Sequence, residues 1–435
     1  MVRVRICKKR LVFAALLVFS FLSSQAFSQP FSALPDSIKI DRVIVAGNVH
    51  TKTSIILREL EFHPGDTVSK KNLELARKRI ENLYLFNRVR FVFLPDGEET
   101  ILKIIVTERW YIFPIPILNF NEHSFSKVSY GGGVAHYNFR GRAEKLFFLG
   151  WAGYNPGLKF IYRNDWFGGK KRYFASFFVK STRVTNHTTA FPDLTSLTKN
   201  VSLDFGKRFG IYRYLAFRTK VEQITPSNPL AAIDVSGKDL WWKAGVFLKY
   251  DNRDLHEYPM DGQLVEVNLQ HAWLNKSHCT IRSLSYDIRA YRSIHSVILA
   301  GRTAGAFMNG NIPVYSHLFI GYGKRIRGHF FEAYEGENRF LTSGAIRFPF
   351  VKKHYYNLSR NLPSLKDLGF AVYGTLFGDT GMVFTQKREL SIRHFQSGLG
   401  AGLNILLPYS NILRLEYAWN EKLQGQFILD GEVAF

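Results

Sequence analysis

The sequence has little cysteine, no long apolar run after its start and no catalytic motif, and each shortage excludes a class of protein. Only 2 of its 435 residues are cysteine, so a disulfide-stapled fold is excluded. After Leu22, polar or charged residues interrupt every hydrophobic run, which excludes membrane-spanning helices there. Nucleophile-elbow, zinc-protease and nucleotide-loop motifs are missing, and the 13 histidines are scattered. We therefore expect no enzyme activity, no metal site and no cofactor.

The N-terminus predicts export. Five cationic residues between Arg3 and Arg10 precede an apolar run from Leu11 to Leu22, and small residues follow up to Ser28. This order is typical of a cleaved signal peptide, here residues 1–28. The alternative is a membrane anchor, but the run is shorter than the roughly 20 apolar residues of a spanning helix.

Acidic residues are scarce relative to basic ones: 58 Lys and Arg face 35 Asp and Glu, for a net charge of +23. Such an excess often binds nucleic acid, but no helix-turn-helix, ribonucleoprotein or zinc-finger pattern accompanies it. An exported protein also leaves the cytoplasmic nucleic acids behind. We expect phosphate-rich lipid surfaces or a charged channel to balance the charge.

Residues 38–109 combine strand and helix periodicity. The order of predicted elements is β-α-α-β-β, enough for one small α+β domain. Ser69 is the expected N-cap of the second helix, whose apolar stripe has helical spacing. Its members are Leu73, Ala76, Ile80 and Leu83.

Residues 111–435 alternate with a period of two to the end of the chain. Leu413, Leu415 and Tyr417 share one face, and Arg414 and Glu416 share the other. Strands of about 10 residues, with their turns and loops, would give about 16 strands, the even number typical of an outer-membrane β-barrel. The aromatic content of 15% suits the interfacial girdles of such a barrel. A soluble β-sandwich is the alternative, but burying Arg and Glu in its dry core would be costly.

Three motifs in residues 38–109 resemble a polypeptide-transport-associated (POTRA) domain. The first is the turn Gly47-Asn48-Val49-His50-Thr51, where Gly47, Asn48 and Thr51 match the family pattern. The others are Pro64-Gly65-Asp66 and the helix end from Leu83 to Val89. The resemblance implies a periplasmic domain.

The segment Ile326-Arg327-Gly328-His329-Phe330 resembles the (V/I)-R-G-(F/Y) loop of the BamA/TamA superfamily, also called the bacterial surface antigen family. In that family the loop folds into the barrel lumen and its Arg pairs with an acid. The matching acid is Asp379, in the F-x-D-x-G segment that ends at Gly381. His329 departs from the pattern, since the family has an aromatic residue there.

Two further matches extend the resemblance over most of the chain. Asp251, Arg253 and Asp254, followed by Gly262, resemble the family's Y-D-x-R-D…P-x-x-G strand, turn and strand. The last strand ends on Phe435, which resembles the signal by which barrels are recognised for insertion. The protein would then itself be a client of the barrel assembly machinery.

The resemblance implies a barrel in the bacterial outer membrane that assists insertion or translocation of polypeptides, or of lipids. The expected partners are outer-membrane lipids including lipopolysaccharide, unfolded outer-membrane or secreted polypeptides, and accessory periplasmic proteins. The chain has room for one POTRA domain, which favours an accessory or specialised member. The alternatives are a passive porin, the membrane part of a split lipase or secretion system and, last, an enzyme within the barrel.

Overall fold

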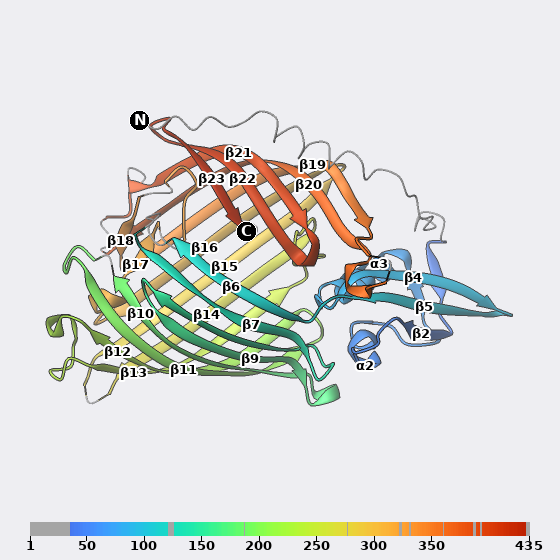
Figure 1. The fold of residues 1–435 in the computed structure, drawn as a ribbon, viewed down its shortest axis with the longest axis horizontal. Helices are drawn as coiled ribbons and strands as arrows, with labels where there is room; N and C mark the ends of the chain where they lie inside the picture. Colours follow the sequence, from blue (N-terminus) through green and yellow to red (C-terminus); the bar gives the residue numbers. More distant parts are fainter. Residues whose placement is uncertain are drawn as a thin grey trace.

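The computed structural model describes residues 35–120, 126–186, 188–275, 277–321, 324–329, 332–359, 361–385, 389–391 and 394–431. They form a small α+β domain followed by a long barrel (Figure 1). The predicted signal peptide, Phe330 and Phe435 lie outside the described residues. Within the described residues no helix is long and apolar enough to span a membrane.

The small domain has a three-stranded sheet in the order β2-β5-β4, with β2 parallel and β4 antiparallel to β5. A separate pair, β1 and β3, runs antiparallel beside it. The elements are β1 (Ser37–Lys39), β2 (Arg42–Ala46), α2 (Thr53–Leu57), β3 (Thr67–Ser69), α3 (Lys70–Glu81), β4 (Phe86–Asp96) and β5 (Glu99–Glu108).

Helix α3 forms as the sequence predicts. The Ser69 side chain accepts a hydrogen bond from the backbone N–H of Asn72, which satisfies one free donor of the first turn. Leu73, Ala76 and Ile80 are fully buried against the sheet. Burial of this apolar stripe, rather than helix propensity alone, stabilises a helix of only 12 residues.

The alternation of residues 38–45 predicts one strand at the start of the β-α-α-β-β order, and this prediction is wrong. These residues belong to two strands, because the chain changes sheets at Ile40 and Asp41. The Ile40 N–H donates to the Asp66 carbonyl, next to β3, and the Asp41 N–H donates to the carbonyl of Thr100 in β5. Alternation persists through this crossing, so it could not reveal the break.

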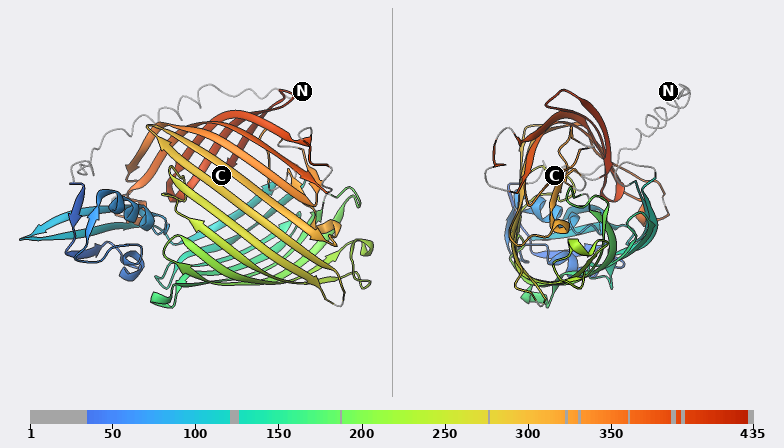
Figure 2. Two further views of the ribbon diagram at one scale, coloured as in Figure 1. Left: turned by 180° about the vertical axis from the view of Figure 1, so that it is seen from behind. Right: turned by 90° about the vertical axis from the view of Figure 1, so that its left-hand side faces the viewer.

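Sixteen antiparallel strands form one sheet that curls into a barrel, which confirms the predicted fold class and rules out the sandwich (Figure 2). Successive strands pair in chain order, except that β16 pairs with β19. The strands are β6 (Ile112–Phe120), β7 (Val128–Phe139), β8 (Glu144–Gly153), β9 (Gly157–Phe167), β10 (Tyr173–Asn186), β11 (Leu194–Phe209), β12 (Arg213–Pro226), β13 (Asp239–Asp251), β14 (Gly262–Leu274), β15 (Thr280–Ile294), β16 (Val297–Gly310), β19 (Asn338–Tyr356), β20 (Leu368–Phe384), β21 (Gln396–Leu407), β22 (Asn411–Asn420) and β23 (Gly425–Gly431).

The two faces of the sheet differ as the alternation predicts. Phe427 and Leu429 of β23 are exposed on the outside, where lipid would cover them. Arg414 and Glu416 of β22 are buried on the inside. The lumen therefore holds the charged residues, as the sequence indicates.

Short elements occupy the connections between strands. The long loop between β16 and β19 contains a small hairpin of β17 (Leu318–Ile320) and β18 (Tyr334–Gly336). Strand direction alternates, so this loop lies at the opposite end from the small domain (Figure 2). The 3-10 helices are η3 (Gly169–Lys171), η4 (Pro229–Ala231), η5 (Val314–Ser316), η6 (Pro363–Leu365) and η9 (Pro408–Ser410).

Candidate functional site: the lumenal loop and the barrel seam

Arg327, in the loop between β16 and β19, makes a bidentate ion pair with Asp379 of β20. Its Nε lies 2.7 Å from Oδ2 and its Nη2 lies 2.7 Å from Oδ1, and its backbone N–H also donates to Oδ2 at 3.1 Å. Its Nη1 donates to Glu416 Oε1 of β22 at 3.0 Å. The guanidinium carbon lies 3.6 Å from the centroid of the Phe377 ring. One buried cation therefore joins the loop to two strands of the lumen wall.

Burial governs the strength of this pair. The side chains of Arg327 and Asp379 are 9% and 5% exposed, so the attraction between them is screened little by water. Burial lowers the pKa of Arg327, but its hydrogen bonds and charge pairing with Asp379 and Glu416 outweigh burial and raise that pKa overall. Arg327 is therefore permanently charged.

Glu416 is shared between two cations. Arg414 Nη1 donates to Glu416 Oε2 at 2.9 Å, and Arg414 Nη2 donates to Asp430 of β23 at 2.7 Å. The charge network thus runs from the loop through β22 to the last strand of the barrel.

Two glycines make room for the loop at this contact. Gly328 has a φ of +101°, and a Cβ there would lie 2.8 Å from the Trp419 carbonyl oxygen. A Cβ on Gly398 of β21 would lie 1.7 Å from the carbonyl oxygen of Arg327. The loop backbone therefore rests directly on the backbone of β21. Gly381 of β20 differs from these two, because the nearest neighbours of a Cβ there would be Leu341 Cδ2 at 2.5 Å and the Phe340 oxygen at 2.7 Å, both in β19, and the loop would meet it only through the Ile326 side chain at 3.3 Å.

The motif of Asp251, Arg253 and Asp254 lies at the end of the barrel nearest the small domain, away from the loop. Asp251 pairs with Arg253, with Oδ1 lying 2.8 Å from Nε and Oδ2 lying 2.9 Å from Nη2. Asp254 instead faces the small domain and accepts from Lys78 Nζ of α3 at 3.0 Å. Gly262, with a φ of +102°, ends the turn. The two acids of this contiguous motif therefore have different roles: Asp251 pairs with Arg253 inside the motif, and Asp254 contacts the small domain.

The turn that resembles a POTRA domain also lies at this junction. Gly47 has a φ of +91°, and the Asn48 side chain closes the turn by donating to the Thr51 carbonyl at 2.9 Å. The Thr51 hydroxyl lies 3.0 Å from the Tyr111 hydroxyl and accepts from Asn138 of β7 at 3.0 Å. The turn therefore attaches the small domain to the first strands of the barrel.

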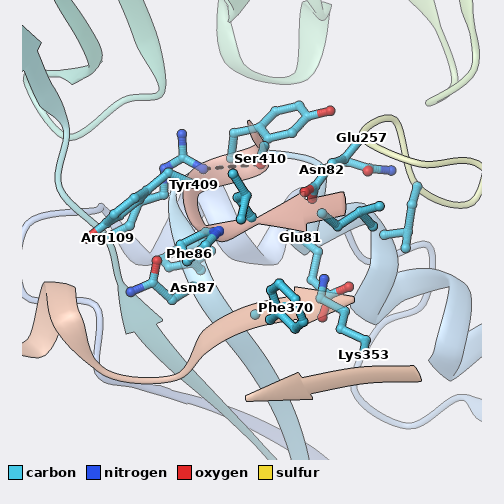
Figure 3. A pocket seen from close by; sticks show the side chains of 16 residues that line it. Glu81, Asn82, Phe86, Asn87, Arg109, Glu257, Lys353, Phe370, Tyr409 and Ser410 are labelled. Atoms are coloured by element: carbon cyan, nitrogen blue, oxygen red, sulfur yellow. Dashed lines mark hydrogen bonds between the residues drawn. The ribbon is translucent and has the colours of Figure 1, made fainter. Parts of the chain in front are cut away.

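A pocket lies at the junction of the small domain and the barrel turns (Figure 3). Arg109 Nη1 lies 3.4 Å from the Ser410 hydroxyl, and burial lowers the pKa of Arg109. Burial also raises the pKa of Glu257 on the opposite wall. The Arg109 guanidinium packs against the rings of Phe113, Tyr137 and Tyr409 at 5.7 to 5.8 Å. This cluster bridges the base of β6 and the turn before β22.

Strands β6 and β23 are the two ends of the sheet, and no pairing joins them in the part of the chain described. The Tyr137 N–H donates to the Tyr111 carbonyl at 2.9 Å, and the register continues without a shift along β6. Alternate residues of an antiparallel strand bond to opposite neighbours. The backbone groups of Ile112, Pro114, Pro116 and Leu118 therefore point toward β23, into the seam.

Two of these four seam positions are proline, which has no N–H to donate. The β6 edge thus presents carbonyl acceptors at Pro114 and Pro116 without the donors that normally accompany them. Proline at such positions is a known way to blunt a strand edge. An unpaired N–H in lipid costs several kcal/mol, so the prolines also lower the cost of leaving this edge open.

An Omp85 superfamily domain model matches residues 138–427, two thirds of the chain. The chain belongs to the Omp85 superfamily. A POTRA model, described as a surface antigen variable number repeat, matches residues 38–109 of this Omp85 protein. The Outer membrane protein assembly factor BamA of Nitratidesulfovibrio vulgaris is 21% identical over 315 residues. That match covers 67% of this chain and 38% of the relative, so this Omp85 protein spans well under half of the relative's length.

Solved structures share the fold. BamA from Haemophilus ducreyi lacking POTRA domains 1–3 has a TM-score of 0.54 at 15% identity, covering 91% of this chain and 84% of its own. CdiB from Escherichia coli has a TM-score of 0.54 at 11% identity, covering 90% and 74%. At these identities the likeness concerns the fold alone.

Three features of the site escape sequence reasoning. Glu416 lies on the predicted polar face, but nothing in the pattern selects it as the second partner of Arg327. Arg109 follows the last strand of the small domain, and nothing in its sequence context predicts its contacts with Ser410 and the three aromatic rings. The spacing of Pro114 and Pro116 indicates that both face the same edge of a strand. The sequence does not show that this edge is the seam, because that depends on the register with β7.

Proposed function

We propose that this protein assists the insertion or translocation of polypeptides at the bacterial outer membrane, through the seam between β6 and β23. The small domain would lie in the periplasm, and binding energy rather than catalysis would drive the process. Kinship with the Omp85 superfamily supports a general assembly or translocation role. The observation that carries the proposal is the donor-poor edge that Pro114 and Pro116 give to β6.

The seam provides a place for an incoming strand. A polypeptide in lipid must satisfy its backbone hydrogen bonds, and an exposed strand edge satisfies them by β-augmentation. The β6 edge retains its seam-facing carbonyls and the N–H groups of Ile112 and Leu118. It can therefore hold a client strand, while the two missing donors keep that pairing weak enough to exchange.

A disulfide across the seam tests the proposal. Cys279, the one cysteine in the described residues, is first replaced by Ser. Cysteines are then introduced at Leu118 and at Phe427 or Leu429, which are outward-facing residues of β6 and β23. The protein is reconstituted in vesicles with an unfolded outer-membrane barrel polypeptide, and insertion is followed by protease protection. Oxidation should stop insertion, and reduction should restore it.

A matched control places the disulfide away from the seam, at Leu248 and Val267, which are directly opposed on β13 and β14. Oxidation of this pair should leave insertion unchanged. Insertion by the seam-locked protein at the rate of its reduced form would refute the proposal. Ion conductance without any insertion would indicate a passive porin instead.

Restoring the missing donors tests the role of the prolines. In the variant P114V/P116V the β6 edge regains two N–H groups, so it should pair more tightly with β23 and insertion should slow. Ile117→Val is the control, because Ile117 bonds to β7 rather than to the seam. Equal insertion by P114V/P116V and the native protein would remove the prolines from the mechanism.

A further inference from the structure

His329 lies at the tip of the lumenal loop, and each of its ring nitrogens meets a carboxylate. Nδ1 lies 2.6 Å from Glu332 Oε2 in the same loop. Nε2 lies 2.7 Å from Glu421 Oε2, in the extracellular turn between β22 and β23, and 3.2 Å from the Ser397 carbonyl oxygen of β21. The imidazole is 2% exposed.

This arrangement requires a particular protonation state. A neutral imidazole carries one N–H, so one of its nitrogens would present a lone pair to a carboxylate oxygen at about 2.7 Å, which is repulsive. Imidazolium carries two N–H groups and can donate to both carboxylates at once. The observed contacts therefore fit the charged form.

The neighbouring charges point the same way. Glu332 and Glu421 are the ionisable acids facing the ring, and the Tyr334 hydroxyl lies 3.2 Å from Nδ1 and donates to Glu332. The nearby cation Arg327 is engaged by Asp379 and Glu416, as described above. Burial lowers the pKa of His329, but its hydrogen bonds to Glu332 and Glu421 outweigh burial and leave that pKa above its usual value.

The contact joins the loop tip to the turn of the last hairpin, which the loop also meets at the Arg327 network and where the backbone of Gly328 lies against Trp419. Glu421 belongs to the turn of the last hairpin, whose second strand, β23, borders the seam. It also accepts a hydrogen bond from the Ser397 N–H at 3.3 Å, which orients it toward the loop. An ion pair at the loop tip therefore acts on the seam hairpin itself.

We propose that His329 is a titratable latch that, when protonated, ties the tip of the lumenal loop to the extracellular turn of the last hairpin. When deprotonated, it releases the tip, while Arg327 still holds the base of the loop. The latch regulates how far the loop closes the lumen, and it operates whatever the barrel transports. Its test therefore does not depend on the proposed insertion activity.

The direction of the pH dependence follows from proton linkage. The pKa of His329 is higher in the docked tip than in the released tip, where it is near the ordinary value of about 6.5. Protonation therefore stabilises the docked tip fully below about pH 6.5, and this stabilisation is lost as the pH rises through the higher pKa of the docked state. One proton then changes the ratio of released to docked tip by up to about tenfold per pH unit. The tip should be docked in acid and released in alkali.

Spin labels measure this directly in the full-length protein. One label replaces Ala333, the exposed residue next to Glu332 in the loop, and the other replaces Leu423 in the β22–β23 turn, in a Cys279→Ser background. The distance distribution is recorded between pH 5.5 and 9 in lipid vesicles. With His329 and Glu421 intact, the distance between the two labels should be short at low pH. A population with a longer distance should grow as the pH rises above about 6.5.

Two variants and one control decide the outcome. H329Q and E421Q should each abolish the pH dependence, and gel mobility before and after heating checks that their barrels fold. His317→Gln is the control, because His317 lies 2.7 Å from Glu335 within the same loop but does not reach the last hairpin. The latch is refuted if the native distance does not change with pH, or if H329Q and E421Q keep the native profile.

Discussion

Removal of the Asp379 carboxylate should undock the lumenal loop. In Asp379→Ala, Arg327 would lose two side-chain hydrogen bonds at 2.7 Å and one backbone hydrogen bond at 3.1 Å. Breaking a buried ion pair by deleting one partner costs about 3–5 kcal/mol. At 1.4 kcal/mol per factor of ten, the docking equilibrium should fall by about two to three and a half orders of magnitude.

Amide hydrogen exchange of residues 324–329 measures this equilibrium. Exchange of the Arg327 amide should accelerate most, because its acceptor is Asp379 itself. Arg327→Ala should be similarly damaging, since Arg327 is the only partner of Asp379 among the described residues and the acid would be left buried and unpaired. Loss of Arg327 should destabilise Glu416 less than Asp379, because Arg414 Nη1 still donates to Glu416 at 2.9 Å.

The double variant separates pairing from general disruption. Arg327→Ala combined with Asp379→Ala leaves no unpaired buried charge at this position, so its cost should fall below the sum of the single costs by about 2 kcal/mol. Strictly additive costs, or native exchange in Asp379→Ala, would show that the ion pair does not hold the loop.

Two further predictions concern the contact of the loop with Gly398 of β21 and the junction with the small domain. Gly398→Ala should raise exchange in the loop at least tenfold, because its Cβ would lie 1.7 Å from the Arg327 oxygen, whereas Gly344→Ala, with open space around it, should change little. Equal exchange in both variants would contradict the contact. Asp254→Ala should loosen the small domain by about 1–3 kcal/mol, seen as a broader spin-label distance between the two parts, because three donors lose their acceptor. Lys78→Ala leaves Asp254 two backbone donors and should have a smaller effect, so a larger one would count against this reasoning.

The sequence predicts the architecture well because the architecture depends on local patterns. Alternation along each strand needs only a wet lumen inside and an apolar surface outside, and both hold here. The N-cap at Ser69 and the stripe of α3 likewise depend on neighbouring residues. The break at Ile40 and Asp41 depends on which distant strand each backbone group meets, and alternation carries no such information.

The candidate site divides along the same line. The motifs that carry Arg327 and Asp379 are short and contiguous, and a charged side chain threaded into a barrel needs a fixed counter-charge, so their pairing is predictable. Glu416 is one of many acids on the inner wall, and Glu421 is one of many in the turns at the barrel end away from the small domain. Only the register of β20, β21 and β22 selects these two.

By itself, then, the sequence determined the barrel, the small N-terminal domain and the loop that carries Arg327, since each follows from periodicity or from a contiguous motif. The tertiary structure decided what borders the loop and the seam. His329 becomes a candidate latch only because Glu421 lies 2.7 Å away, 92 positions along the chain. Pro114 and Pro116 face the seam rather than β7 only because the hydrogen bond between Tyr137 and Tyr111 sets the edge that each backbone group faces. Strand register decides both the neighbours of His329 and the edge that the two prolines face. Register arises from pairing between distant strands rather than from local sequence.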